Sequence, residues 1–344
     1  MIGKEPDRVV VLQPGFIGDV ILVSPILISL RAAYPRAQLA LVVRPEKQRL
    51  AKTLQGVDRV LVFDKRGDDS GFLGLAQAAS RLEKLDFDLL ISPHRSTRTA
   101  MLAYLSRIPV RVGFMQGAGR VLYNIRVPLS KNEPCRLEQE FSLLRALGLE
   151  PVATRPMISP PGEALDYAKD FLSALRIEPD RCVGLCIGAN WATKRWPGVW
   201  FARLAAMLVD AGCFPILFGG PDEQGLAGEI QREFDTNVDG TLNSCVGNDL
   251  IQAMGLLAAC AVVVGGDTGL VHMARGVNTP VIMMYGPTDE RLHHHHGNEK
   301  VLVADVPCRP CHRHGKARCP KKHHRCMKDI LPQTVFSAVM DFLD

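Results

Sequence analysis

The feature that most constrains the fold of this chain is a repeated alternation of short apolar runs with segments whose apolar residues have helical spacing. The runs are rich in valine, leucine and isoleucine, which is typical of strands buried on both faces of a parallel sheet. Such alternation predicts a doubly wound α/β fold. In the first half we expect strands at 9–12, 39–43, 60–63 and 89–91, and helices at 21–33, 72–85 and 97–105.

A proline-rich stretch between residues 149 and 161 interrupts the alternation and marks a linker. Beyond it we expect strands at 183–187, 214–218, 261–264 and 281–285, and helices at 164–175, 200–211, 250–260 and 332–343. A chain of 344 residues is also longer than a single core usually grows. The sequence therefore predicts two doubly wound Rossmann-like domains facing a cleft, an architecture of the GT-B type. The two domains span 1–160 and 161–330. A closing helix is expected at 331–344, and the sequence leaves open whether it crosses back to the first domain.

The composition, with 47% hydrophobic and 22% charged residues, is that of an ordinary globular protein. No apolar run reaches the length of a membrane span. Lys4, Glu5, Asp7 and Arg8 stand where a secretory signal needs an apolar core, so we expect a cytoplasmic protein. Because that compartment is reducing, cysteines inside apolar patterns are most simply interpreted as buried core residues. These are Cys182, Cys186, Cys213 and Cys260.

Residues that carry chemistry follow the expected strand at 261–264. It runs into two glycines and then into Asp267, Thr268 and Gly269, after which a helical pattern containing His272 begins. A carboxylate, a hydroxyl and free backbone N–H groups thus meet at the sheet edge where α/β proteins bind ligands. Helix N-termini also favour phosphate. The segment predicts half of a site for a phosphorylated, hydroxyl-rich ligand such as a nucleotide sugar.

A second carboxylate, Asp19, follows the first expected strand and a turn that contains Gly15 and Gly18. Aspartate is a favoured residue at helix starts, so capping alone explains it. Asp19 is also the only acidic residue between Asp7 and Glu46, and it lies at the carboxyl edge of the sheet. A carboxylate there is able to take a proton from an acceptor hydroxyl. Both interpretations remain open.

Two further groups follow strands of the second half. Lys194 and Arg195 precede an expected helix, which favours a diphosphate clamp over a solvated pair of cations. Asp222 and Glu223 follow the strand at 214–218 and either accept hydrogen bonds from ribose hydroxyls or begin a helix. None of the glycine-containing turns at these strand ends is a complete G-x-G-x-x-G fingerprint, so a nicotinamide cofactor is not indicated.

The stretch from Ile91 to Asn132 has no acidic residue but many basic ones. A stretch of one sign indicates an anionic partner, such as a phosphorylated substrate, an anionic membrane surface or nucleic acid. For any single arginine, a solvated surface position is the simpler interpretation. The basic residues are Arg95, Arg98, Arg107, Arg111, Arg120, Arg126 and Lys131.

Four segments, in this order and spacing, resemble the ADP-heptose:lipopolysaccharide heptosyltransferases, which form glycosyltransferase family 9 and have the GT-B fold. The resemblance covers nearly the whole chain, and the second segment together with the cysteine-containing tail is most similar to the heptosyltransferase II branch. The segments are Gly18-Asp19-Val20 followed by Ser24-Pro25, Thr193-Lys194-Arg195-Trp196-Pro197, Gly266-Asp267-Thr268-Gly269-Leu270-Val271-His272, and Tyr285-Gly286-Pro287-Thr288.

The resemblance implies an inverting, metal-independent transfer of heptose from ADP-L-glycero-β-D-manno-heptose to the inner core of lipopolysaccharide, a Kdo–lipid A type of acceptor. It places this reaction at the cytoplasmic face of the inner membrane and requires no cofactor. Asp19 matches the general base, and Lys194 matches the cation that neutralises the departing ADP. The matching donor contacts are Thr193, Lys194, Glu223, Asp267, Thr268, Gly269 and His272. The candidates for acceptor binding, from the stretch without acidic residues, are Arg95, Arg98 and Arg120.

The tail contains four cysteines, Cys308, Cys311, Cys319 and Cys326, among several histidines. This set suits a tetrahedral structural zinc site, although the spacing departs from paired C-x2-C motifs. Reduced thiols in a basic loop that faces the membrane or the acceptor are the alternative. We expect any metal there to be structural rather than catalytic. The run His293–His296 has two interpretations, incidental metal binding and a polar loop tip, of which the loop tip is the simpler.

Two other functions remain open from the residues alone. One is a GT-B glycosyltransferase with a different donor or acceptor. The other is a non-enzymatic nucleic-acid-binding protein that uses the basic stretch. Aromatic residues make up only 6% of the chain, and such a protein has no use for Asp19 or the Asp-Thr-Gly turn, so we expect no nucleic-acid partner.

Overall fold

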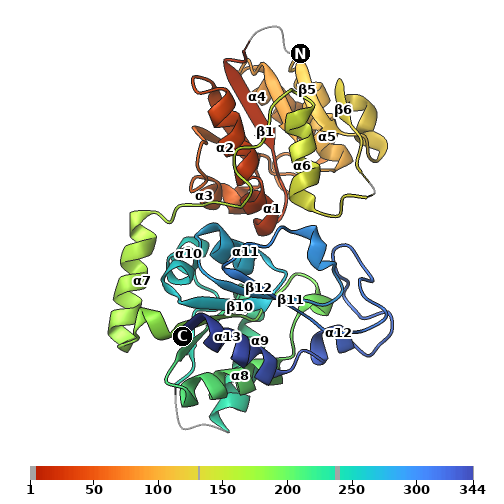
Figure 1. The fold of residues 1–344 in the computed structure, drawn as a ribbon. Helices are drawn as coiled ribbons and strands as arrows, with labels where there is room; N and C mark the ends of the chain where they lie inside the picture. Colours follow the sequence, from red (N-terminus) through yellow and green to blue (C-terminus); the bar gives the residue numbers. More distant parts are fainter. Residues whose placement is uncertain (1–4, 131, 237–240, 344) are drawn as a thin grey trace. The chain divides into compact units, whose positions relative to one another are not determined.

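The computed structural model describes residues 5–130, 132–236 and 241–343. They belong to two compact units, Met1–Ser159 and Pro160–Asp344 (Figure 1). The boundary between the units falls in the proline-rich stretch of the sequence. Each unit contains a six-stranded parallel sheet with helices packed against it. Among the helices of the described residues, none has the length and apolar character needed to cross a membrane.

The sheet of the first unit has the strand order β3-β2-β1-β4-β5-β6. Val10 of β1 pairs with Ala40 of β2 on one side and with Leu90 of β4 on the other. The order therefore reverses between β1 and β4, and α/β sheets bind ligands beyond the carboxyl ends of the strands at such a switch point. The elements are β1 (Arg8–Leu12), α1 (Ile17–Leu22), α2 (Ser24–Ala33), β2 (Gln38–Val43), η1 (Pro45–Lys47), α3 (Gln48–Ala51), β3 (Arg59–Val62), α4 (Gly71–Glu83), β4 (Leu89–Ser92), α5 (Thr97–Leu105), β5 (Val110–Phe114), η2 (Ala118–Leu122), β6 (Ile125–Val127) and α6 (Arg136–Arg145).

The second unit repeats this plan with the order β12-β11-β10-β7-β8-β9. Val263 of β10 pairs with Gly184 of β7 and with Val281 of β11, so the switch point lies between β7 and β10. The elements are α7 (Gly162–Leu175), η3 (Pro179–Arg181), β7 (Cys182–Cys186), η4 (Ala192–Lys194), α8 (Gly198–Asp210), β8 (Phe214–Phe218), η5 (Pro221–Glu223), α9 (Gln224–Asp235), β9 (Asn243–Ser244), α10 (Leu250–Ala259), β10 (Val262–Gly266), α11 (Gly269–Gly276), β11 (Val281–Tyr285), η6 (Glu290–Leu292), β12 (Glu299–Val303), α12 (Arg325–Lys328) and α13 (Pro332–Leu343).

Burial explains why the apolar runs form these strands. Residues 9–12 of β1 are completely buried, as expected for a central strand covered on both faces. The helices bury one stripe each; in α4 this stripe contains Leu75, Ala78 and Leu82. The four cysteines expected in the core are all buried, so that prediction is confirmed; they are Cys182, Cys186, Cys213 and Cys260.

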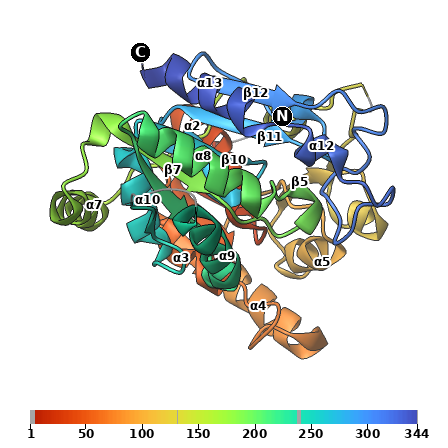
Figure 2. The same ribbon diagram turned by 90° about the horizontal axis from the view of Figure 1, so that it is seen from below.

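Two expectations about elements are corrected. The single helix expected at 21–33 is two helices, because Pro25 lies in the first turn of α2 and has no N–H with which to continue α1. Strands β5, β6, β9 and β12 were not expected. The first three lack an uninterrupted apolar run, whereas β12 contains the short run 301–303 and was overlooked. The closing helix α13 belongs to the second unit, where it lies beside α8 (Figure 2).

The packing of α10 on α7 supplies a test of the second unit. A Cβ on Gly255 of α10 would lie 1.9 Å from the backbone carbonyl oxygen of Ala164 in α7, which cannot move aside cheaply. We therefore expect Gly255→Ala to lower the free energy of unfolding by about 1–3 kcal/mol or more, measured by denaturant titration. Gly228→Ala in α9 is the matched control. Its Cβ meets nothing within 4 Å, so it is expected to stabilise by up to about 1 kcal/mol through helix propensity. Equal effects of the two substitutions would contradict this packing.

Candidate active site

In the first unit, Asp19 lies in the first turn of α1, beyond the carboxyl end of β1. Its Oδ2 accepts a hydrogen bond from the Phe16 N–H at 2.8 Å, so it does cap its own helix. Gly15 permits this geometry, because a Cβ there would lie 2.4 Å from Oδ2. Capping uses only one of the two carboxylate oxygens, which leaves Oδ1 for another role.

Oδ1 of Asp19 is paired with the guanidinium of Arg136, which also donates to Glu140 Oε1 at 2.8 Å. Burial works to raise the pKa of Asp19, but the Arg136 charge and the Phe16 N–H outweigh it, so the pKa is lowered. Asp19 is therefore ionised at neutral pH, which is the form that a general base requires. Its side chain remains 18% exposed and thus accessible to a substrate hydroxyl.

Further basic side chains surround Asp19 because they follow the neighbouring strands. Arg44 follows β2 and donates from Nε to the Gly15 carbonyl at 3.2 Å, and Lys65 follows β3. His94 follows β4, where burial and the charge of Lys65 lower its pKa to about 4, so the ring is neutral at pH 7. The carboxyl edge of this sheet therefore places Arg44, Lys65 and Arg136 around the Asp19 carboxylate, which suits an anionic, hydroxyl-bearing ligand.

The three arginines expected to bind the acceptor differ in their surroundings. Arg95 lies over the Phe114 ring, donates to Gln139 Oε1 at 2.7 Å, and lines a hollow beyond β4 and β5. Arg98 donates to the backbone carbonyls of Asp69 and Gly71, so its guanidinium holds the start of α4 in place. Arg120 is exposed on η2. The geometry thus gives Arg98 a structural task, whereas Arg95 and Arg120 are better placed to meet a ligand.

In the second unit, Asp267 lies at the end of β10 and is contacted by four side chains. Lys194 Nζ is 2.5 Å from Oδ2, and the Thr288 hydroxyl donates to the same oxygen at 3.2 Å. His272 Nε2 and His293 Nε2 lie 3.1 and 3.4 Å from Oδ1. Although burial works to raise the pKa of Asp267, the Lys194 charge and the hydrogen bonds of the two histidines hold it well below its usual range.

The tautomer of His272 follows from its second contact. Arg275 Nη1 lies 3.2 Å from His272 Nδ1, and a guanidinium only donates hydrogen bonds, so Nδ1 accepts. The proton is therefore on Nε2 and is donated to Asp267. Burial lowers the pKa of His272, and the Arg275 charge contributes to the same shift. His272 is thus a neutral donor that orients Asp267.

The histidine run is not a loop tip, and that interpretation is corrected. The His293 side chain is 9% exposed and contacts Asp267, while His295 lies 3.3 Å from Glu299 Oε2. Glu299 in turn pairs with Arg275 at 2.9 Å. Sequence reasoning missed this because the His293 contact joins the segment after η6 to the end of β10, which are close only in the folded sheet.

Asp267, His272 and His293 also form a group whose geometry resembles a metal site. However, the ammonium of Lys194 already occupies a position next to the carboxylate, and Arg275 approaches the far side of His272. Two fixed cations oppose a third positive charge at this point. The group is better explained as a hydrogen-bonded support for Lys194.

The remaining expected donor residues lie around Lys194. Arg195 pairs with Glu223 Oε1 at 3.3 Å, and Glu223 Oε2 also accepts the Gly220 N–H at 2.8 Å. Glu223 therefore does cap the start of η5, as one of its two interpretations expected, and its side chain remains 13% exposed at the sheet edge. A Cβ on Gly266 would lie 2.6 Å from the Lys194 carbonyl oxygen, so only glycine lets β10 approach this loop so closely.

Thr268 and Gly269 begin the helix α11. The first N–H groups of a helix have no partner within the helix. The Thr268 Oγ1 is buried and has no hydrogen-bond partner among the described residues. These donors lie next to Lys194 and Asp267, and together they suit the phosphates and hydroxyls of a nucleotide sugar.

Several site residues were missed, but most had a signal. Arg44 and Lys65 each follow a strand, so a search for polar residues at the carboxyl end of every strand would have found them. Thr288 belongs to one of the four segments that resemble the family, but it was given no role. Arg136 had no such signal, because it starts a helix that follows the last strand of its sheet.

Comparisons with known proteins identify the family of this chain. The sequence model of Glycosyltransferase family 9 (heptosyltransferase) matches residues 75–322. The lipopolysaccharide heptosyltransferase 2 of Escherichia coli is 25% identical over 342 residues, covering 95% of this chain and 96% of that protein. The lipooligosaccharide heptosyltransferase 2 of Haemophilus influenzae is 26% identical over 300 residues, covering 82% of this chain and 84% of that protein.

Solved structures share the fold. A glycosyl transferase of family 9 from Veillonella parvula aligns with a TM-score of 0.85 at 22% identity, over 98% of this chain and 97% of that one. The E. coli ADP-heptose heptosyltransferase II aligns with a TM-score of 0.80 at 23% identity, over 98% of each chain. The predicted pair of doubly wound domains, with the GT-B fold, is thereby confirmed. With the family model matched over most of its length, this chain is a glycosyltransferase that belongs to glycosyltransferase family 9 (heptosyltransferase).

Proposed function

We propose that this enzyme transfers L-glycero-D-manno-heptose from ADP-heptose to the inner core of lipopolysaccharide, in the manner of heptosyltransferase II. The single observation that carries the proposal is the arrangement on Asp267, where Lys194 is held beside the start of α11. The relatives named lipopolysaccharide heptosyltransferase 2 support the choice of sugar and acceptor. The reaction would take place at the cytoplasmic face of the inner membrane, where peripheral contact gives access to the acceptor.

Donor binding is assigned to the second unit. Lys194 and the N–H groups of Thr268 and Gly269 would contact the diphosphate, with Thr193 and His272 keeping them in place. Glu223 would accept hydrogen bonds from the ribose. As the anomeric bond breaks, ADP gains negative charge, so a fixed cation and free N–H groups stabilise the transition state more than the bound substrate.

Acceptor binding is assigned to the first unit. Asp19 would take the proton of the acceptor hydroxyl as its oxygen attacks the anomeric carbon from the face opposite ADP, which inverts that centre. The reaction is metal-independent in this proposal, because Lys194 supplies the positive charge at the leaving group. Arg95 and Arg120 would contact the acceptor phosphates and carboxylates, and the positive edge formed by Arg44 and Lys65 would assist.

The role of Asp19 is tested by Asp19→Asn. Loss of a general base is expected to lower kcat by about 10²–10⁴-fold, while the ADP dissociation constant measured by calorimetry stays unchanged. Asp58→Asn is the matched control, since Asp58 also pairs with an arginine, Arg31, but precedes β3 at the opposite edge of the sheet. Full activity of Asp19→Asn would refute the assignment.

The dependence on pH tests the pairing with Arg136. The pKa of Asp19 is lowered in the folded protein, so the basic form is present above that pKa and is lost only below the usual carboxyl range. Arg136→Met removes the positive charge that opposes the effect of burial on Asp19, so the pKa of Asp19 rises. The acid limb of the kcat/KM profile therefore moves to higher pH. Arg145→Met on the same helix, which pairs with Glu138, is expected to leave the limb in place. An unmoved limb in Arg136→Met would contradict the pairing.

Lys194→Ala tests donor binding. Removing one charge-assisted contact is expected to raise the ADP dissociation constant by about 10- to 100-fold, measured by calorimetric titration. Lys300→Ala is the control, because Lys300 also pairs with an aspartate, Asp341, but lies near the amino end of β12. Preference of the wild type for UDP-sugars over ADP-heptose would instead assign the enzyme a different donor.

A further inference from the structure

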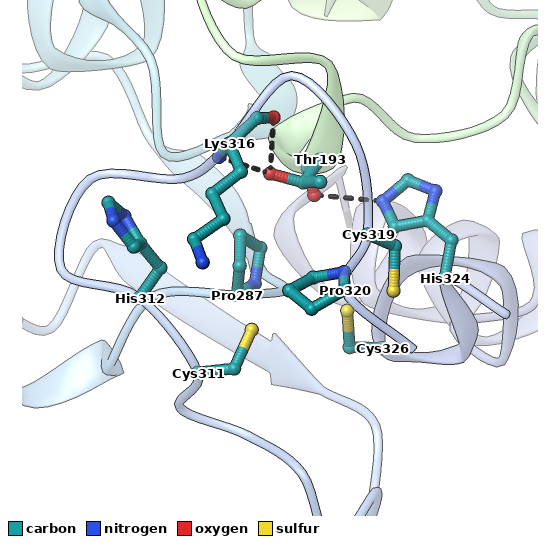
Figure 3. Close-up of a pocket in the computed structure, with 9 residues that line it drawn as sticks. All are labelled: Thr193, Pro287, Cys311, His312, Lys316, Cys319, Pro320, His324 and Cys326. Carbon is teal, nitrogen blue, oxygen red and sulfur yellow. Dashed lines mark hydrogen bonds between the residues drawn. The ribbon is translucent and has the colours of Figure 1, made fainter. Parts of the chain in front are cut away.

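The segment 308–326, here called the cysteine loop, joins the region after β12 to α12 and has no part in the proposed reaction. It brings together Cys308, Cys311, Cys319 and Cys326, none of which is in a disulfide. Figure 3 shows the sulfur atoms of Cys319 and Cys326 facing one another, with the Cys311 sulfur turned toward the same hollow. Three thiols from separate parts of the loop therefore line a single hollow.

Cys319 begins the turn that leads to α12, in which the Lys322 N–H donates to the Cys319 carbonyl at 3.0 Å. The loop also contains seven lysines and arginines and no acidic residue, so its charge would offset that of metal-bound thiolates. These basic residues are Arg309, Arg313, Lys316, Arg318, Lys321, Lys322 and Arg325.

The fourth cysteine lies at the margin of this group. Cys308 Sγ is 3.8 Å from His323 Nε2. Among the described residues, only Asp267, His272 and His293 have their ligand atoms all within 4.8 Å of one another. The four sulfurs are therefore further apart than in a loaded tetrahedral site, and a bound ion would draw Cys308 and Cys311 inward.

The cysteine loop is hydrogen-bonded to the donor site on one side. The Thr193 hydroxyl donates to the Lys316 carbonyl at 2.9 Å and accepts the Lys316 N–H at 2.7 Å, and His324 Nε2 lies 2.8 Å from the Thr193 carbonyl oxygen (Figure 3). Gly315 packs so closely that a Cβ would lie 3.2 Å from the Lys194 side chain. The position of Lys194 therefore depends on the conformation of this loop.

On the other side, the loop contacts the turn that follows β11. The N–H groups of Cys311 and His312 both donate to the Pro287 carbonyl at 3.0 Å. Pro287 precedes Thr288, whose hydroxyl donates to Asp267. One loop thus holds the segments that carry both Lys194 and the partner of its carboxylate.

We propose that Cys308, Cys311, Cys319 and Cys326 bind one tetrahedral metal ion, zinc or iron, and that this ion fixes the position of Lys194 through Thr193 and Thr288. Four thiolates in tetrahedral arrangement select these two metals. The ion is structural and takes no part in the transfer. The link to the donor rests on the function proposed above, whereas the metal site does not.

The site is tested on the full chain, purified under reducing conditions without chelator and exposed to Zn²⁺ or to Fe²⁺ without oxygen. Elemental analysis is expected to find one ion per chain and to show which metal is retained. Cys311→Ser and Cys326→Ser are expected to lose it, while Cys213→Ser, a cysteine elsewhere in the same unit, keeps it. Absence of metal from the wild type, or its retention in both loop variants, would overturn the site.

The coupling is tested by comparing loaded protein with protein stripped by a chelator. Amide exchange at residues 191–195 and 286–289 is expected to quicken after stripping. The ADP dissociation constant should rise about tenfold or more, since small misplacements at a site are costly. Unchanged exchange would overturn the coupling while the metal content still establishes the site. Failure of the loaded wild type to bind ADP would count against the proposed donor, not against the metal.

Discussion

The structure of the second unit depends on the burial of one ionised carboxylate. Asp267 is 8% exposed, and a buried charge is tolerated only when it is paired and fully hydrogen-bonded. Its partners Lys194, His272, Thr288 and His293 come from four different segments around the sheet edge. The carboxylate therefore fixes the relative positions of these segments, and the cation that would meet a diphosphate is held as one of its partners.

The first unit solves a similar problem with a different outcome. Asp19 is also paired with a cation, Arg136, but it stays partly exposed. Arg136 also pairs with a second carboxylate, Glu140. The pKa of Glu140 is raised by burial in spite of the Arg136 charge. The arginine is thus shared, and Asp19 stays ionised and accessible. The two sheets share one topology, and each has a carboxylate at its carboxyl edge. Asp267 is buried and holds its partners in place, whereas Asp19 stays accessible.

Many basic residues of the stretch without acidic residues serve the fold rather than a ligand. Arg98 and Arg111 donate to backbone carbonyls, and Arg107 pairs with Glu83 on α4. A guanidinium has five donors, so it readily satisfies carbonyls that would otherwise lack partners at loop ends. Charge counting along the chain therefore overestimated the positive surface, because it did not distinguish arginines that bind backbone from those that remain available.

The sequence by itself determined the class of fold and the position of most catalytic candidates. Apolar runs predict strands, glycines end them, and parallel strands bring their carboxyl ends to one edge, so Asp19, Lys194 and Asp267 were found without coordinates. Only the tertiary structure decided the partners. Arg136 contacts Asp19 across 117 residues of sequence, His293 contacts Asp267, and the cysteine loop contacts Thr193. Such contacts have no periodicity in the sequence, because they are set by how the strands are ordered in the sheet and not by their order along the chain.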